Sequence, residues 1–302
     1  MSTAFSRALT GAGVRCDNCL RGAGLLSPSN LILTYHAVGD PRKYGSVPVD
    51  RLHRDLAYLT GRFDVVDLAD LVDAVRNGTP GRRVALTFDD GYRDFYTNAL
   101  PVLHRYDAPA TVFVCPAFVD DGNPDLLRRL FTSPDSPAVQ GHDGPTTVLP
   151  DSGDPLMLTE RQLRALVDDD LVAIGNHTMT HPDLRGISDE ADLRREIVGG
   201  KEALETRFDV AIDRFSYPYG RFTESSVRIA ESSHDLAVTT LPGRVSTEEN
   251  PYRLPRVTAH TNPGQFRWNL ADSRWTIADV RSRIVDVTAR TAARFGLGPR
   301  SG

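Results

Sequence analysis

The sequence predicts an α/β fold in which short parallel strands alternate with helices. Apolar runs at 31–35, 84–88 and 111–114 have the length of strands that are buried on both faces. Stretches with leucine and valine at helical spacing separate these runs. This alternation is typical of βα units around a parallel sheet. In such folds the residues that carry chemistry follow the carboxyl ends of the strands.

Capping residues indicate where helices begin and end. Asp67 precedes an apolar run with helical spacing that stops at Gly78. Thr159 is followed three residues later by a glutamine, which is the spacing of a capping box. A long helix is expected from Ser188, interrupted by the two glycines at 199–200. Three further helices are expected at 52–59, 99–106 and 223–233.

Four more short apolar segments complete the expected strands. They lie at 171–174, 212–217, 236–240 and 252–257, and the last has the character of an edge strand. The stretch at 120–155 lacks periodicity and is rich in Pro, Gly, Asp and Ser. A segment of this length is usually a functional loop, a lid or disordered, and strand-end loops of this kind determine specificity.

Composition and charge narrow the class of protein. The 302 residues carry a formal net charge of −5, which gives no indication of nucleic-acid binding. Cys16 and Cys19 form a lone C-x-x-C without a second pair, and together with Cys115 we expect them to be free thiols. The sequence lacks the apolar core of a signal peptide and any run of about 18 apolar residues. We therefore expect a cytoplasmic protein without a transmembrane segment, and its oligomeric state is not indicated.

We expect one domain over residues 29–302, preceded by a poorly ordered lead-in at 1–28. The lead-in is rich in Gly, Ser, Ala and Arg. The chain ends in an expected helix at 276–295, which combines an apolar stripe with several arginines. Such a helix packs its stripe on the domain, as we expect here, or makes a peripheral contact with an anionic membrane.

Two adjacent carboxylates follow the expected strand at 84–88. A turn opened by Gly91 can aim Asp89 and Asp90 differently, so that one carboxylate meets a cation and the other takes a proton. The alternative is a helix N-cap with a solvated neighbour, which fits Asp-Asp-Gly alone equally well.

Two histidines follow the expected strand at 171–174. His177 and His181 are four positions apart and can reach one ion if the backbone makes a helical turn between them. Pro182 disfavours helical geometry at His181, so this turn should end there. The same spacing also occurs in histidine pairs on helix surfaces.

Two further strand ends carry candidate site residues. His36 follows the expected strand at 31–35, where it either lines the site or bonds to nearby loops. The turn at 218–220, Pro-Tyr-Gly, holds its backbone stiffly, so an amide N–H there could point at a fixed position. The alternative for this segment is an ordinary turn.

The order of these motifs resembles that of the polysaccharide deacetylases with NodB homology, the carbohydrate esterase family 4 type. The similar segments are T-F-D-D-G at 87–91, H-T-x-x-H at 177–181 and P-Y-G at 218–220. Leu-Thr-Tyr-His at 33–36 and Leu-Pro-Arg-Val at 254–257 are similar to one branch of that family. The resemblance covers most of residues 30–260 and implies a distorted (β/α)7 barrel, with fewer strands than a TIM barrel.

The resemblance also implies a metal centre and its chemistry. Asp90, His177 and His181 would be the metal ligands, and Asp89 the general base. The ion would be one divalent metal, Zn2+ first, with Co2+ or another divalent ion as the alternative, and no other cofactor is implied. Two imidazoles and one carboxylate leave coordination positions open, as hydrolytic zinc requires. The implied reaction removes acetyl groups, N-acetyl first, from an acetylated saccharide.

Two further roles follow from the same resemblance. The backbone N–H of Tyr219 would help to hold the oxyanion, and His260 would be the general acid that protonates the leaving amine. The residues around His260 match the family poorly, so His36 or a water molecule are alternatives. An amine leaves poorly without a proton, so O-deacetylation also stays open.

The sequence departs from the family pattern beside the Pro-Tyr-Gly turn. The family has an arginine two residues before the proline, where it orients the base, and this chain has Ser216. Arg214 is the candidate to take its place, since residues two apart on a regular strand share a face. Alternative functions are hydrolysis of a small non-sugar amide and a non-catalytic carbohydrate-binding barrel. The identity of the sugar cannot be read from the sequence.

Overall fold

The computed structural model describes residues 28–41, 43–122, 125, 127, 155–259 and 262–275. The chain divides into two compact units, Asn30–His260 and a second unit of Met1–Ser29 with Thr261–Gly302. The expected lead-in, most of the expected loop at 120–155 and the expected helix at 276–295 lie outside the described residues. The extent of the domain therefore stays a prediction.

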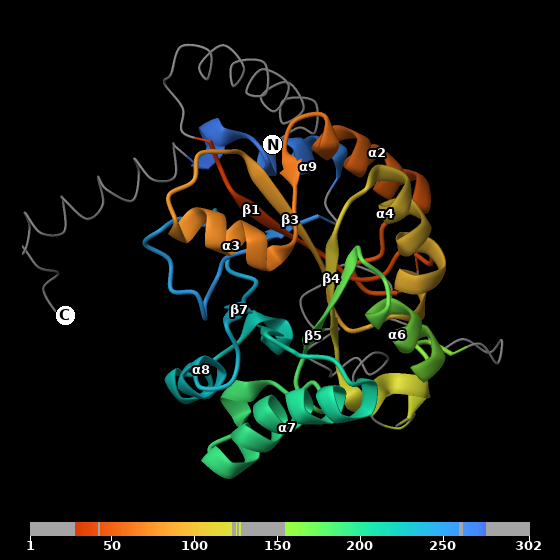
Figure 1. Ribbon diagram of the computed structural model, residues 1–302, viewed down its shortest axis with the longest axis vertical. Helices are drawn as coiled ribbons and strands as arrows, with labels where there is room; N and C mark the ends of the chain where they lie inside the picture. Colours follow the sequence, from red (N-terminus) through yellow and green to blue (C-terminus); the bar gives the residue numbers. More distant parts are fainter. Residues whose placement is uncertain are drawn as a thin grey trace, which may run out of the picture. The chain divides into compact units, whose positions relative to one another are not determined.

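The larger unit is built on a parallel sheet (Figure 1). Its strand order is β7-β6-β5-β4-β3-β1-β8, and β2 pairs with β3 beside this path. Every recorded strand pair is parallel. The strands are β1 (Leu31–Tyr35), β2 (Asp64–Val65), β3 (Arg83–Phe88), β4 (Ala110–Val114), β5 (Val172–Asn176), β6 (Arg214–Ser216), β7 (Leu236–Val238) and β8 (Val257–Thr258). The predicted parallel α/β architecture is confirmed.

Helices alternate with these strands and cover the sheet (Figure 1). The α-helices of this unit are α2 (Val49–Thr60), α3 (Leu68–Arg76), α4 (Leu100–Tyr106), α6 (Glu160–Val167), α7 (Glu190–Phe208) and α8 (Glu224–Glu231). Single turns occupy Phe95–Ala99, Pro116–Asp121, Leu184–Gly186 and Pro218–Gly220. In the smaller unit, α9 spans Pro263–Asn269. Within the described part of the chain, no helix has the length and apolar character needed to cross a membrane.

The predicted helix starts agree with the structure where capping residues indicated them. Asp67 caps α3 by accepting a hydrogen bond from the Ala69 N–H. Thr159 and Gln162 form the expected capping box at the start of α6. The apolar stripe of α3 then packs on buried side chains of the sheet, Ile32 and Ala85 among them. Burying each such side chain contributes about 1.5–3 kcal/mol to folding, so these stripes fix the helices on the sheet.

Two predicted elements differ from the structure. The helix expected from Ser188 begins at Glu190, because the Asp189 carboxylate accepts hydrogen bonds from two N–H groups of the first turn. The strand expected at 252–257 is limited to Val257–Thr258. The residues before it cannot continue a regular ladder, because Pro255 lacks an N–H and the Arg256 N–H bonds to the Leu241 carbonyl in a loop.

The two glycines of α7 do not interrupt the helix, contrary to the sequence prediction. A Cβ at Gly200 would lie 2.7 Å from Asn176 Oδ1 and 2.8 Å from the Met179 nitrogen. A Cβ at Gly199 would make only ordinary contacts, the nearest at 3.8 Å. Gly200 therefore allows α7 to lie directly against the segment that follows β5.

We expect opposite effects from alanine at these two neighbouring positions. Gly200→Ala should lower the free energy of unfolding by about 1–3 kcal/mol, because the methyl group would push α7 away from backbone atoms. Gly199→Ala should raise it by up to about 1 kcal/mol, because alanine is the better helix former. Urea denaturation of both variants measures this difference, and equal effects would contradict the close packing at Gly200.

Candidate metal centre

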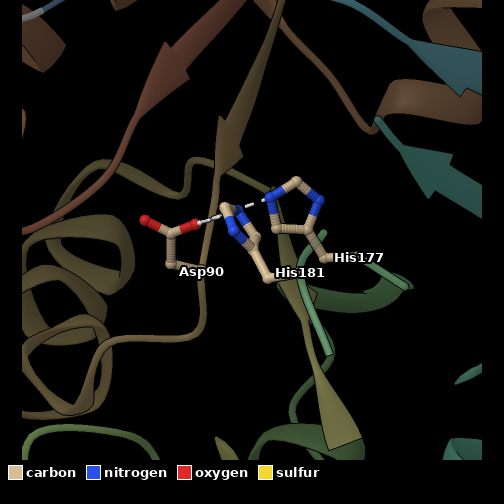
Figure 2. Close-up of side chains that lie close together, drawn as sticks. All are labelled: Asp90, His177 and His181. Atoms are coloured by element: carbon tan, nitrogen blue, oxygen red, sulfur yellow. Dashed lines mark ion pairs between the residues drawn. The ribbon is translucent and has the colours of Figure 1, made fainter. Parts of the chain in front are cut away.

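Asp90, His177 and His181 converge at the carboxyl-end edge of the sheet (Figure 2). Asp90 lies beyond β3, and both histidines lie beyond β5. Asp90 Oδ1 is 3.5 Å from His177 Nε2 and 3.2 Å from His181 Nε2. All three residues are buried, and their candidate ligand atoms lie within 4.8 Å of one another. Two imidazoles and a carboxylate at this spacing form a donor set that suits a divalent cation such as Zn2+.

The second nitrogen of each imidazole is held by a neighbouring group. His177 Nδ1 donates to the Ser216 carbonyl at 2.7 Å. His181 Nδ1 is hydrogen-bonded to the Tyr219 hydroxyl at 3.2 Å. Such contacts fix the orientation of ligating histidines in metalloproteins and leave Nε2 facing the metal. The arrangement of both rings therefore fits a metal centre.

The Asp90 carboxylate is favoured in its ionised form. Burial alone would raise the pKa of Asp90, but its hydrogen bonds with His177 and His181 more than offset this and hold the pKa far below its usual range. A carboxylate that stays ionised at all physiological pH values is available as an anionic ligand.

The two histidines meet without the helical turn that the sequence predicted. Thr178 and His181 adopt left-handed backbone conformations, with φ of 66° and 59°. The His177 N–H bonds to the Val114 carbonyl of β4, and the Met179 N–H bonds to the Glu196 carbonyl of α7. A helical turn would need the His181 N–H to bond to the His177 carbonyl, but this N–H bonds to Thr178 Oγ1, and the carbonyl accepts from the Cys115 thiol.

Four residues of the site have positive φ although none is glycine. They are Asp90 at 75°, Thr178 at 66°, His181 at 59° and Tyr219 at 58°. Such conformations cost about 1–3 kcal/mol each and persist only where the surrounding structure imposes them. Their concentration around one cluster is typical of a functional site, and it is least expected for the β-branched Thr178.

Asp89 is held by an arginine that the sequence analysis did not identify. Arg256 donates from Nη1 to Asp89 Oδ1 at 2.8 Å and from Nη2 to Oδ2 at 2.6 Å. Its Nε donates to the Thr239 carbonyl, and both charged residues are buried. Burial would raise the pKa of Asp89, but the charge and hydrogen bonds of Arg256 hold it below its usual value. Asp89 is thus ionised and fixed in orientation.

Ser216 lies beside Asp89, and Arg214 is paired with other residues. Ser216 Oγ lies 3.5 Å from Asp89 Oδ1 and accepts a hydrogen bond from Arg256 Nη2 at 3.1 Å. Arg214 does not take the place of the family's arginine. Its guanidinium pairs with the carboxylates of Asp67 and Asp213, each at 2.7 Å. The Leu-Pro-Arg-Val segment contained the only sequence signal for Arg256.

Two of the other candidates can be located, and one cannot. His36 follows β1 and is half-buried, with its ring edge-on to Tyr44 at 4.8 Å. Burial lowers the pKa of His36, and the charges of Asp90 and Asp89 oppose this effect, so its role at the site stays a prediction. Tyr219 lies in the left-handed turn after β6. His260 lies outside the described residues, so its role as the acid stays a prediction.

Comparison with known families shows which family this chain belongs to. The sequence profile described as polysaccharide deacetylase matches residues 76–234, which is more than half of the chain. The chain belongs to the polysaccharide deacetylase family. The match includes Asp89, Asp90, His177 and His181, so the resemblance stated from the motifs is confirmed.

Individual relatives of this polysaccharide deacetylase family member are moderately similar to it. The YxkH protein of Bacillus subtilis (strain 168) is 29% identical over 182 residues, covering 60% of this chain and 52% of that protein. The chitooligosaccharide deacetylase of Sinorhizobium fredii (strain NBRC 101917 / NGR234) is 28% identical over 165 residues, covering 54% of this chain and 59% of that protein. The chain thus spans little more than half the length of these curated relatives.

A solved structure shows the same fold. The Streptococcus pyogenes deacetylase PplD in complex with acetate has a TM-score of 0.62 at 22% identity, covering 81% of this chain and 99% of that chain. The parallel sheet therefore forms the half-barrel of this fold, and the predicted distorted (β/α)7 barrel is confirmed.

The buried ion pair of Asp89 and Arg256 predicts that replacing Arg256 changes protein stability in a pH-dependent way. In Arg256→Met the largest influence that opposes the burial of Asp89 is lost, and only the weaker influence of His177 and His36 stays, so the pKa of Asp89 should rise above the unfolded-state value. The variant should lose about 3–5 kcal/mol of stability at pH 7, because a buried charge is left unpaired. In the variant, part of this loss should be recovered as the pH falls, because Asp89 then takes a proton and is no longer an unpaired charge. In the wild type the sign is opposite: the stability that Asp89 contributes is lost as the pH falls through its lowered pKa.

Urea denaturation at several pH values and the carboxyl 13C shift of Asp89 measure these effects. Arg214→Met is the control, since it removes another buried arginine but should leave the pKa of Asp89 unchanged. An equal change in the Asp89 pKa in both variants would show that Arg256 has no special influence on it.

Proposed function

We propose that this protein is a metal-dependent hydrolase that removes acetyl groups, N-acetyl first, from a saccharide. The observation that carries the proposal is the buried cluster of Asp90, His177 and His181 directly beside Asp89, which Arg256 holds ionised. Membership of the polysaccharide deacetylase family and the deacetylase activity named for the Sinorhizobium relative support it. The bond broken would be the non-peptide C–N bond of an acetamido group.

Asp90, His177 and His181 would hold one divalent cation, with Zn2+ as the first choice and Co2+ as an alternative. Such a cation lowers the pKa of a water molecule and polarises the acetyl carbonyl. The hydrogen bonds of His177 with Ser216 and of His181 with Tyr219 would keep both imidazoles in ligating orientation.

Asp89 would accept the proton of the attacking water. A general base must be ionised and correctly aimed, and the two hydrogen bonds from Arg256 supply both conditions. Ser216 Oγ lies 3.5 Å from Asp89 Oδ1 and accepts a hydrogen bond from Arg256 at 3.1 Å. Arg256, which directly precedes β8, would thus orient the base. In the family pattern an arginine two residues before the proline of the Pro-Tyr-Gly turn has this role.

Residues at two other strand ends would stabilise the oxyanion and protonate the leaving group. The backbone N–H of Tyr219, in its left-handed turn, is the proposed donor to the oxyanion. His260 is the proposed acid for the leaving amine, and His36, which follows β1, is the alternative.

Replacing Asp89 by asparagine should separate base catalysis from metal binding. We expect Asp89→Asn to lower kcat by about 10²–10⁴-fold, because the proton acceptor is lost, while the bound metal stays at the wild-type level. Acetate release from an N-acetylated chitooligosaccharide gives the rate, and elemental analysis gives the metal content. Asp170→Asn, at an exposed position, is the control and should change neither.

The substrate class is tested with the same assay. Chelation of the metal should abolish acetate release, and Zn2+ or Co2+ should restore it. Turnover of small non-sugar amides without any turnover of acetylated saccharides would contradict the proposed substrate. Full activity of Asp89→Asn would contradict the base assignment.

A further inference from the structure

The segment between the two metal-ligating histidines does not fix its own shape. Thr178 and His181 adopt left-handed conformations that non-glycine residues avoid. Within the segment, the His181 N–H bonds to Thr178 Oγ1 at 3.0 Å. Contacts from outside the segment must therefore impose the positions of the two rings.

One side of this segment is held by the end of β4. The His177 N–H bonds to the Val114 carbonyl at 3.0 Å, and the Cys115 thiol donates to the His177 carbonyl at 2.9 Å. Slightly further along, the Ala117 N–H bonds to the Met179 carbonyl at 3.2 Å. These contacts fix the first histidine firmly and stop before Thr180.

The other side is held by Glu196 of α7. Its two carboxylate oxygens accept from the Thr180 N–H at 2.9 Å and from the Thr180 hydroxyl at 2.7 Å. Its backbone carbonyl accepts from the Met179 N–H at 2.9 Å. Gly200, one turn further along α7, allows this approach because a Cβ there would collide with the same segment. Glu196 thus contacts the residue directly before His181 through both oxygens.

We propose that Glu196 is a positioning residue that sets the metal affinity of the site by holding the segment of Thr178 to His181 in its strained conformation. The inference rests on the proposed metal-dependent function. Without the Glu196 side chain, Thr180 loses the two hydrogen bonds that its N–H and hydroxyl donate to the carboxylate. His181 can then relax toward ordinary backbone angles and away from Asp90. Both carboxylate oxygens of Glu196 bond to Thr180, so its influence on His181 passes through Thr180.

The test compares Zn2+ affinities of the full-length chain, measured by chelator competition. Glu196→Ala should raise the Kd for Zn2+ by about 10–100-fold, the usual effect of removing a group that supports a ligand. Glu196→Gln should stay close to wild type, because the amide can accept from the Thr180 N–H and donate to its hydroxyl. Glu202→Ala, at an exposed position on the same helix, is the matched control and should have no effect.

Two measurements make the test independent of enzyme activity and of folding losses. Hydrogen exchange of the Thr180 amide in the metal-free protein should accelerate in Glu196→Ala and stay slow in Glu196→Gln. Thr180→Ala removes only the hydroxyl that bonds to Glu196, so it should weaken Zn2+ binding less than Glu196→Ala does. The double variant with Glu196→Ala and Thr180→Ala should bind Zn2+ no more weakly than Glu196→Ala alone.

The outcomes separate this inference from the proposed function. Wild-type protein that binds no Zn2+ would contradict the proposed function and the inference together. Tight binding by wild type and equally tight binding by Glu196→Ala would overturn the inference alone. A loss in Glu196→Gln as large as in Glu196→Ala would show that the negative charge matters, not the held conformation, and would also overturn it.

Discussion

The register of three adjacent parallel strands is the constraint on which the site depends. Phe88 of β3 pairs with Val112 of β4, and Val114 pairs with Asn176 of β5. Asp90, two residues beyond Phe88, therefore comes level with Val114 and with the end of β5. A Cβ added at Gly91 would lie 3.4 Å from the Val114 methyl groups, as this register requires. A shift of one residue in either strand pair would separate the carboxylate from the histidines.

The site places two carboxylates in a buried environment and gives each a different counterpart. Asp90 faces two imidazoles, and Asp89 faces the guanidinium of Arg256. Buried ion pairs of this kind contribute little net stability, because removing both charges from water is costly. Such pairs contribute to the specificity of the fold instead. The two hydrogen bonds from Arg256 connect Asp89 to a residue 167 positions later in the chain, and this contact aligns the end of β3 with the segment before β8.

Much of this arrangement could be predicted from local sequence. β1, β3 and β4 were located within one residue, because fully buried parallel strands appear as unbroken apolar runs, whereas the two-residue strand β2 was not predicted. The helix caps at Asp67 and Thr159 were predicted because their hydrogen bonds join residues close in sequence. Asp89, Asp90, His177 and His181 were singled out because each follows a strand, although their proposed roles stay predictions.

The features that escaped prediction depend on contacts between distant residues. Arg256 pairs with Asp89 across most of the chain, and its neighbours carry no periodic signal. Arg214 was considered in its place, but its guanidinium pairs with Asp67, the N-cap of α3, and with the adjacent Asp213. The left-handed backbone at Thr178 could not be foreseen, because α7 and β4 impose it.

The central claim is that Asp90, His177 and His181 bind one metal ion. Zinc X-ray absorption fine structure of the Zn2+-loaded protein tests it most directly. The account predicts one zinc per chain, coordinated by two imidazole nitrogens and oxygen, with one imidazole missing in His181→Ala. Coordination through sulfur, or a spectrum that is unchanged in His181→Ala, would contradict it.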